Sequence, residues 1–222
     1  MITEADKLIR ETFQIQIEGG PPYVGRDCLS RFTLYAIFRK LGFTHGAEIG
    51  VRGGKNAIEL FRAIPKLKLL LVDPYVAYKT RMSFIDQYAM SEFEAKCRKR
   101  LAGKKTEFIK KPSLEAALQV EDNSLDFVYI DGDHSFDAVI QDLIAWVPKV
   151  RPGGIVSGHD YTPVVGVSKA VDAYTSAHGI YNWYLTDGSG TVDEKTLHVQ
   201  ELFGKTRRHY KLDNCSFFWE KR

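Results

Sequence analysis

The chain has 222 residues and a mass of 25.2 kDa, which suits one α/β domain with short additions. Hydrophobic residues make up 44% of it and charged residues 27%, as in ordinary globular proteins. A net charge of +3 gives little reason to expect general nucleic-acid binding. The three cysteines lack the paired spacing of a disulfide framework or a zinc site, and no apolar run approaches the ~20 residues that span a bilayer. With no signal-peptide pattern at the N-terminus, we expect a cytoplasmic protein that binds neither nucleic acid nor membranes.

Apolar periodicity and turn residues predict helices that alternate with strands. Helices are expected at residues 5–14, 27–40, 55–64, 83–101, 136–150 and 166–178, and a short one capped by Ser113. Strands are expected at residues 47–49, 67–72, 107–109, 125–130, 155–156, 181–185 and 216–219. This order predicts an α/β fold with a doubly wound, mostly parallel seven-stranded sheet that has an antiparallel edge.

The first 45 residues precede the first core strand. We expect residues 1–45 to form an N-terminal helical cap on a domain of residues 46–222. The second helix of the cap has a wide apolar face. That face could pack on a second copy of the chain, so a homo-oligomer is one expectation.

A glycine-rich segment, EIGVRGGKNA, links the first core strand to the following helix. Glycines let a backbone turn sharply and approach a ligand closely. Gly50 is followed by Val51 and Arg52, which breaks the G-x-G-x-x-G spacing of dinucleotide-binding proteins. Glu48 would repel a pyrophosphate but attract a cationic ligand, and S-adenosylmethionine carries an ammonium, a sulfonium and an adenosine. The alternative is a glycine turn in an unrelated α/β protein.

An acid ends the next strand. Asp73 lies 19 positions after Gly54, close to the ~20-residue offset of acids that accept hydrogen bonds from ribose hydroxyls. The pair of signals predicts a nucleoside-type ligand.

Two further acids follow later strands. Asp131 begins DGDH after the fourth strand, and Asp160 lies in SGHDY after the fifth. Neighbouring strands are about 4.8 Å apart, so both carboxylates could reach one ion. Oxygen ligands suit Mg²⁺, Mn²⁺ or Ca²⁺, and nearby histidines favour Mn²⁺ or Fe²⁺. The alternative is that Asp131 caps a helix and Asp160 caps a turn.

Two histidines accompany these acids. His134, beside two acids, could have a pKa near neutral pH and act as a general base, or it could simply hold the loop. His159 could be a metal ligand, a support for Asp160, or a structural residue.

Several short motifs together carry a family resemblance. They are Glu48-x-Gly50, Asp73-Pro74, Ser113-Leu-Glu115, DGDHSF at 131–136, Trp146-x-Pro148 and PGG-x-x-x-GHDY at 152–161. With them the chain resembles class I S-adenosylmethionine-dependent methyltransferases, in particular methyltransferase family 24, akin to macrolide-sugar and catechol-type O-methyltransferases. The resemblance covers about residues 46–161, and the rest of the chain matches in expected topology alone. It implies a Rossmann-like methyltransferase fold.

The resemblance also implies which residues bind the cofactor. Glu48 and Gly50 would hold the methionine end of S-adenosylmethionine, and Gly54 belongs to the same turn. Asp73 would bind the ribose hydroxyls and Pro74 would lie against the adenine. At the end of the third strand, Ser113 would meet the adenine edge.

The same resemblance gives roles to the second cluster. Asp131 would face the methionine moiety or a metal, and Asp160 would be a second acidic ligand. His159 departs from the acid often found at its position. His134 falls where sugar-modifying relatives carry a proposed base.

The implied activity is O-methylation of a hydroxyl on a small molecule or sugar, with possible assistance from Mg²⁺ or Mn²⁺. A nicotinamide-dependent oxidoreductase would share the fold but needs the missing glycines. An RNA or protein methyltransferase should show a basic face or an acceptor-binding motif. A binding module that keeps the cofactor pocket without catalysis is the third alternative.

Overall fold

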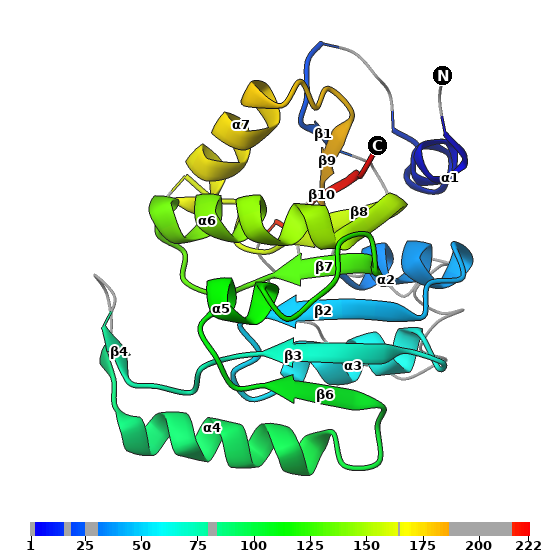
Figure 1. Cartoon of the computed structure of the whole chain (residues 1–222). Coiled ribbons are helices and arrows are strands. Elements are labelled where there is room, and N and C mark those ends of the chain that lie inside the picture. The colour runs from blue at the N-terminus through cyan, green and yellow to red at the C-terminus, as the bar shows by residue number, and fades with distance from the viewer. Residues whose placement is uncertain (1–2, 16–18, 25–30, 80–83, 164, 187–214) are drawn as a thin grey trace.

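The computed structural model describes residues 3–15, 19–24, 31–79, 84–163, 165–186 and 215–222 (Figure 1). The helices are α1 (Glu4–Phe13), α2 (Arg31–Lys40), α3 (Lys55–Ala63), α4 (Gln87–Arg100), α5 (Ser113–Ala117), α6 (Phe136–Trp146), the 3₁₀ turn η1 (Val147–Lys149) and α7 (Val167–Ala177). The strands are β1 (Tyr23–Val24), β2 (His45–Ile49), β3 (Lys68–Val72), β4 (Tyr78–Lys79), β5 (Phe84–Ile85), β6 (Thr106–Ile109), β7 (Leu125–Ile130), β8 (Val150–Gly158), β9 (Trp183–Leu185) and β10 (Phe217–Glu220).

Eight strands form one sheet in the order β1-β9-β10-β8-β7-β2-β3-β6, while β4 and β5 pair separately as an antiparallel ribbon. Within the large sheet, β10 runs antiparallel to both of its neighbours and every other pairing is parallel. The arrowheads of β2, β3, β6 and β7 accordingly point the same way in Figure 1. The predicted doubly wound, mostly parallel sheet is confirmed, and all seven predicted strands are present.

The far end of the sheet differs from the prediction in two ways. The short strand β1 pairs with β9 and adds an eighth strand. The antiparallel strand β10 is not the edge, because β9 and then β1 lie outside it. The sequence order suggested an edge because β10 comes last in the chain, but its two neighbours are set by side-chain packing and hydrogen bonding across the sheet.

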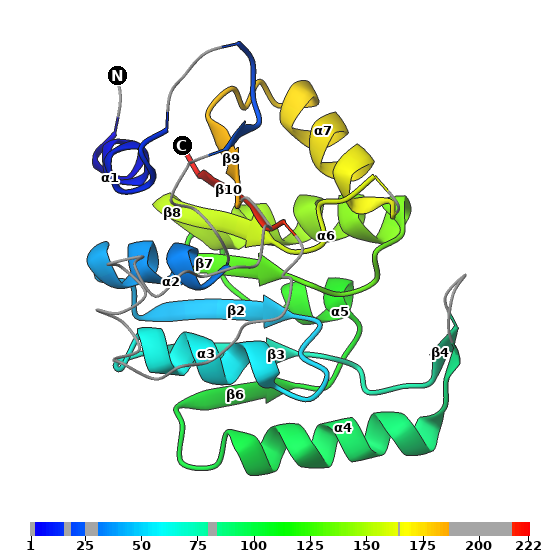
Figure 2. The same ribbon diagram turned by 180° about the vertical axis from the view of Figure 1, so that it is seen from behind.

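Helices cover both faces of the sheet (Figures 1 and 2). One layer of buried side chains lies between the sheet and α1 to α4, and the other lies between the sheet and α5 to α7. Strand β7 contributes side chains to both layers. Phe127 and Tyr129 belong to the first layer, and Val128 and Ile130 belong to the second. Successive side chains of a strand point to opposite faces, so an apolar run is what a sheet covered on both sides requires.

Three predicted element boundaries are wrong. The helix expected at 83–101 begins at Gln87, capped by Asp86, because Phe84 and Ile85 form β5 instead. The helix expected at 136–150 gives way at Val147 to a 3₁₀ turn that contains Pro148, a residue without an N–H for the helical ladder. The fifth strand begins at residue 150, and the PGG segment lies inside it, where the pairing with β7 shifts register.

The N-terminal residues share the core of the rest of the chain. In α2, Leu34, Tyr35, Ile37 and Phe38 are fully buried, and the Phe38 ring stacks on Phe127 at 4.5 Å between centroids. The apolar face that suggested a subunit interface is therefore covered by the chain's own sheet. The division between residues 45 and 46 stays a prediction, and residues 27–30, where the second predicted helix was expected to begin, lie outside the described residues.

Among the helices that the structure describes, none is both long and apolar enough to cross a membrane.

Candidate functional site

The loops after three neighbouring strands start side by side. The Gly50 N–H donates to the last residue of β3 at 2.9 Å, the Asp131 N–H to the last residue of β2 at 2.8 Å, and the His159 N–H to the last residue of β7 at 3.0 Å. Each loop is thus held to the strand beside it for one residue beyond the sheet. Ligands of open α/β sheets bind at this carboxyl edge, so the glycine turn and both acidic segments face one site.

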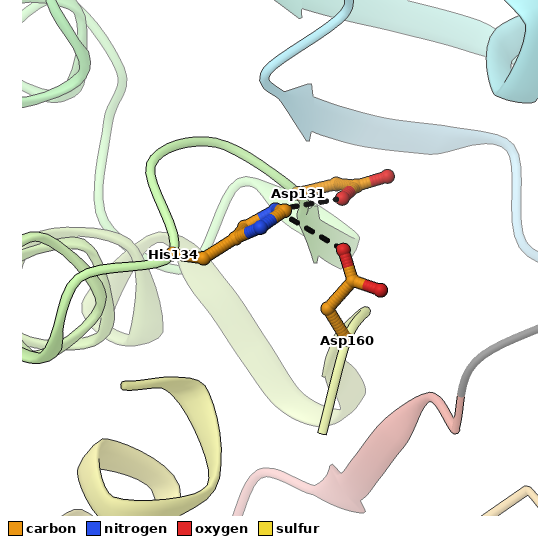
Figure 3. A group of neighbouring side chains, drawn as sticks. All are labelled: Asp131, His134 and Asp160. Atoms are coloured by element: carbon orange, nitrogen blue, oxygen red, sulfur yellow. Dashed lines mark ion pairs between the residues drawn. The ribbon is translucent and has the colours of Figure 1, made fainter. Parts of the chain in front are cut away.

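His134 lies between two carboxylates at that edge (Figure 3). Its Nε2 is 3.2 Å from Asp160 Oδ2 and 3.6 Å from Asp131 Oδ1. The three side chains offer ligand atoms that all lie within 4.8 Å of one another. Asp160 has a positive φ of 56°, an uncommon conformation for a residue with a Cβ, and this conformation directs its carboxylate into the cluster.

The surroundings of His134 change its proton affinity. The interaction with Asp131 is the main cause that raises the pKa of His134 above 6.5, and the charge of Asp160 adds to it. Partial burial and the neighbouring His159 act in the opposite direction. His134 is therefore a stronger base than an imidazole in water, and its side chain is still 37% exposed to solvent.

His159 lies behind the same two acids. Its Nδ1 is 3.2 Å from Asp160 Oδ1 and 3.7 Å from Asp131 Oδ1, and the residue is 9% exposed. The sequence analysis grouped His159 with the two aspartates as a metal set. The structure adds His134 to a compact group of ligand atoms with the two acids and keeps His159 at similar distances from both acids, so the role of His159 as a ligand stays a prediction.

Glu48 lies near the end of β2 and faces the α2 and α3 layer. It is 1% exposed, and Oε2 has no hydrogen-bond partner among the residues that the structure describes. Burial raises the pKa of Glu48 well above its usual range, and the charge of Asp131 raises it further, while Asn56 and Arg31 lower it. A buried acid with an unpartnered oxygen is suited to a ligand that brings positive charge.

Gly50 allows the closest backbone contact of the site. Its φ is +87°, and a Cβ there would lie 2.2 Å from the carbonyl oxygen of Asp131. A side chain at this position would push apart the ends of β2 and β7. Position 50 must be glycine because the loops after β2 and β7 come too close there for a side chain. The backbone of the turn at Gly50 therefore has no side chain to cover it at the carboxyl edge.

Asp73 holds the glycine turn in place. Its carboxylate accepts hydrogen bonds from the N–H of Arg52 at 2.7 Å and of Tyr75 at 2.9 Å. Burial raises the pKa of Asp73, and these backbone donors oppose that rise. The next residue, Pro74, is half-buried. The backbone N–H of Val51 acts in the same direction as these donors, and the ribose role of Asp73 stays a prediction.

Gly54 has a packing role in the structure. It is the N-cap of α3 with a φ of +66°, and a Cβ there would lie 2.8 Å from the Sγ of Cys97 in α4. This contact requires glycine for the packing of α4 against the turn. The cofactor role that the sequence analysis gave Gly54 stays a prediction.

Ser113 is the first residue of α5 rather than its cap, which is Pro112. Its hydroxyl donates to Asp142 Oδ1 and accepts from Trp146 Nε1 at 2.8 Å. Burial raises the pKa of Asp142 to about 6. The adenine contact that the resemblance implies for Ser113 stays a prediction.

Two site residues escaped the sequence analysis. Arg31 of α2 lies 3.8 Å from Asp131 Oδ2, and Asn56 of α3 interacts with both Arg31 and Glu48. Both belong to helical segments whose local pattern indicates an amphipathic helix. Arg31 is a charged residue at the start of an otherwise apolar helix face, and this was the one feature of the sequence that could have marked it as a site residue.

Comparison with known proteins agrees with this geometry. Residues 47–161, more than half of the chain, match the model of a methyltransferase domain family, methyltransferase family 24. A protein of Sinorhizobium fredii, y4gI, whose function is uncharacterised, is 36% identical over 52 residues. That match covers 23% of this chain and spans 6% of the length of y4gI.

Solved structures show the same fold at low sequence identity. The O-methyltransferase TomG from Streptomyces achromogenes, solved with S-adenosylmethionine, has a TM-score of 0.55 at 16% identity, covering 99% of this chain and 91% of TomG. The precorrin-6y C5,15-methyltransferase of Geobacter metallireducens has a TM-score of 0.51 at 13% identity, covering 86% of this chain and 87% of that one.

The family match spans the strand ends that carry Glu48, Asp73, Asp131 and Asp160, and the fold is the one that methyltransferases share. The chain therefore belongs to methyltransferase family 24 and is an S-adenosylmethionine-dependent methyltransferase.

Proposed function

We propose that the chain transfers the methyl group of S-adenosylmethionine to a hydroxyl oxygen of a small molecule or sugar. The observation that carries this proposal is the position of His134. The imidazole lies between Asp131 and Asp160 at the carboxyl edge of the sheet, and the backbone of Asp131 lies against Gly50 of the glycine turn. A base at that place suits an acceptor that must lose a proton, as a hydroxyl must.

The cofactor fits the residues of the turn. The unpartnered, buried Oε2 of Glu48 suits the ammonium of the methionine end, and Gly50 gives the backbone room to approach it. The Asp73 carboxylate suits the ribose hydroxyls, with Pro74 beside the adenine and Ser113 at its edge. These placements extend the family resemblance to the geometry of this chain.

Methyl transfer is an in-line displacement in which the sulfonium supplies an electrophilic methyl group. The oxygen–carbon bond forms as the carbon–sulfur bond breaks, and the bonding pair stays on sulfur. The imidazole of His134 accepts the hydroxyl proton, and the carboxylates of Asp131 and Asp160, which face its Nε2, stabilise the resulting imidazolium. The protein otherwise aligns the two reactants, which can contribute up to ~7–11 kcal/mol.

A divalent cation is a second element of the proposal. Asp131, His134 and Asp160 form a group of oxygen and nitrogen ligand atoms that suits Mn²⁺ or Mg²⁺, with His159 next to it. Such an ion would lower the pKa of an acceptor hydroxyl. It would also compete with protons for the imidazole of His134. His134 can therefore act either as a metal ligand or as a general base, but not as both at once.

The first test is methyl transfer from isotope-labelled S-adenosylmethionine to a panel of sugars, catechols and other hydroxyl compounds, with products detected by mass spectrometry. The variant His134→Gln should lower turnover by about 10²- to 10⁴-fold and leave the affinity for S-adenosylhomocysteine within about threefold. His45→Gln, an exposed histidine at the opposite end of β2, is the matched control.

Three outcomes would contradict the proposal. Methylated nitrogen or carbon acceptors without any hydroxyl product would exclude O-methylation. Unchanged turnover of His134→Gln would exclude the base. No turnover with any acceptor, despite tight binding of S-adenosylhomocysteine, would favour a binding module.

The metal is tested by chelation. If it assists, dialysis against EDTA should reduce turnover at least tenfold, and Mn²⁺ or Mg²⁺ should restore it. The variant Asp160→Asn should respond less to added metal than the wild type. Full activity after chelation would instead assign the cluster to base catalysis alone.

We propose a small-molecule or sugar acceptor as the partner, with neither nucleic acid nor a membrane among the partners. The small net charge supports this choice. A homo-oligomer stays part of the proposal through surfaces other than the buried face of α2.

A further inference from the structure

Two residues that contact Asp73 have a backbone conformation that residues with a side chain seldom adopt. Arg52 in the glycine turn has a φ of 48°, and Tyr75 in the loop after β3 has a φ of 50°. Such left-handed backbone persists only where the surrounding contacts hold it. Both residues donate a backbone hydrogen bond to the carboxylate of Asp73. The two unusual conformations therefore meet at the acid that the proposed function assigns to the ribose.

The contacts of these three residues close a ring. The Arg52 N–H donates to Asp73 Oδ2 at 2.7 Å, and the Tyr75 N–H donates to Asp73 Oδ1 at 2.9 Å. The Tyr75 hydroxyl donates to the carbonyl oxygen of Arg52 at 2.9 Å. Both polar groups of the Arg52 backbone are thus bound to the loop after β3. Because each oxygen of the Asp73 carboxylate has a backbone donor in this ring, the orientation of the carboxylate depends on where Arg52 and Tyr75 lie.

The hydroxyl of Tyr75 is a dependable donor for this ring. The residue is 2% exposed, and its aromatic ring belongs to the layer of buried side chains between the sheet and α1 to α4. Burial raises the pKa of the Tyr75 hydroxyl well above its usual range, and the neighbouring Cys97 raises it further. The hydroxyl therefore stays protonated at physiological pH, and packing of the aromatic ring fixes its position.

Helix α4 holds both segments that form the ring of contacts. Gln87, its first residue, donates from Nε2 to the Tyr75 carbonyl at 2.9 Å and accepts from the N–H of Ala77 at 3.1 Å. The Arg52 guanidinium lies over the Phe93 ring, 4.6 Å from its centroid. Helix α4 therefore stabilises the loop after β3 and the glycine turn in their positions relative to each other.

We infer that Tyr75 is a positioning residue for cofactor binding. Its hydroxyl fixes the backbone of Arg52, and through it the carboxylate of Asp73, in the orientation that meets the ribose. The inference rests on the proposed ribose contact of Asp73 and does not depend on which acceptor is methylated. The competing role is that Tyr75 contributes only to the packing of the core, which would leave the cofactor affinity of the folded protein unchanged when the hydroxyl is removed.

The test compares two ligands that differ in the ribose alone, S-adenosylhomocysteine and its analogue without the 2′- and 3′-hydroxyls. Tyr75→Phe keeps the aromatic ring and the backbone N–H and removes the hydrogen bond to Arg52. In calorimetric titrations of the full chain, it should weaken S-adenosylhomocysteine by about 3- to 10-fold and change the affinity of the analogue by less than about twofold. Tyr184→Phe is the matched control. It removes another buried hydroxyl, one that binds Asp6 of α1, and should leave the affinity of both ligands unchanged.

A second variant tests the same loop without altering the core. Gln87→Ala, at an exposed position, removes the donor to the Tyr75 carbonyl and should also weaken S-adenosylhomocysteine selectively, by about two- to fivefold. If Tyr75→Phe does not fold, the comparison of the two ligands with Gln87→Ala decides the inference.

Asp73→Asn, titrated with the same two ligands, separates this inference from the ribose assignment. If Asp73 binds the ribose, this variant also weakens S-adenosylhomocysteine more than the analogue. Should Tyr75→Phe then weaken both ligands equally, or neither, the inference is overturned and the ribose contact stands. If Asp73→Asn itself shows no selectivity, the ribose contact fails and the inference fails with it. Neither result bears on the hydroxyl acceptor, because both are binding measurements.

Discussion

At the residue scale, the carboxyl edge of the sheet combines acids that differ in how their charge is balanced. Glu48 is buried and one of its oxygens has no hydrogen-bond partner in the described part of the chain, whereas Asp73 accepts backbone hydrogen bonds from Arg52 and Tyr75. Asp131 and Asp160 share a histidine. Burial alone would favour protonated acids, and a bound cation or donor favours the ionised form. These surroundings support the proposed contacts of Glu48 with a cationic group and of Asp73 with hydroxyl donors.

The Asp73 carboxylate gives a direct prediction about the cofactor. Asp73→Asn keeps one oxygen for the loop and removes the charge, so we expect S-adenosylhomocysteine to bind about 10- to 100-fold more weakly by calorimetry. Asp122→Asn, an exposed aspartate paired with Lys149, should change nothing. Tight binding by the Asp73 variant would contradict its assignment to the ribose.

At the element scale, helix α4 packs so closely against Gly54 of the glycine turn that there is no room for a side chain at that position. Cys97 and Leu101 lie at 2.8 and 3.4 Å from a Cβ at Gly54. The same turn carries Gly50 and the donor to Asp73, so the packing of α4 fixes the geometry of the cofactor site indirectly.

Two glycines with similar positive φ angles allow the cost of backbone strain to be measured apart from the cost of a steric clash. Gly42 has a φ of +70° with open space around it, and Gly54 has a φ of +66° with Cys97 close by. We expect Gly42→Ala to lower the free energy of unfolding by about 1 kcal/mol and Gly54→Ala by about 1–3 kcal/mol more, measured by chemical denaturation. Equal losses would show that α4 adapts at no cost. If Gly54→Ala kept its stability and lost cofactor affinity, Gly54 would have the binding role instead.

At the scale of the whole molecule, buried carboxyls link folding to pH. Asp142 is 5% exposed, and burial raises its pKa from 3.8 to about 6. The folded state therefore binds this proton more tightly than the unfolded state. Its contribution to stability is lost as pH rises through about 6 and is regained as pH falls toward 3.8.

This linkage predicts a change in the pH profile of stability. Between about pH 7.5 and pH 4.5, the free energy of unfolding of the wild type should gain about 2 kcal/mol from Asp142. Asp142→Asn keeps an acceptor for Ser113 and should lack this gain in denaturation experiments. Asp137→Asn, an exposed aspartate on the same helix, should keep the profile of the wild type. Parallel profiles for wild type and Asp142→Asn would contradict the raised pKa.

Local patterns in the sequence were sufficient for the alternation of helices and strands. Strand β7 has apolar residues on both faces, and residues near the ends of four strands are glycine or acid. Because the carboxyl ends of parallel strands share one edge, the acids at Glu48, Asp73, Asp131 and Asp160 could be placed together without a structure. The order of motifs along the chain also indicated the family.

The tertiary structure decided what the local patterns could not. It placed β10 between β8 and β9, brought both His134 and His159 within 3.7 Å of Asp131 and Asp160, and brought Arg31 of the cap to Asp131. Each of these contacts joins segments that lie far apart in the sequence. Whether such segments meet depends on the order of the strands, on helix packing and on loop conformations such as the positive φ at Asp160. The sequence alone therefore determined the fold class, the family and the edge of the sheet that carries the acids. The tertiary structure decided which cations face those acids, because that depends on contacts between distant parts of the chain.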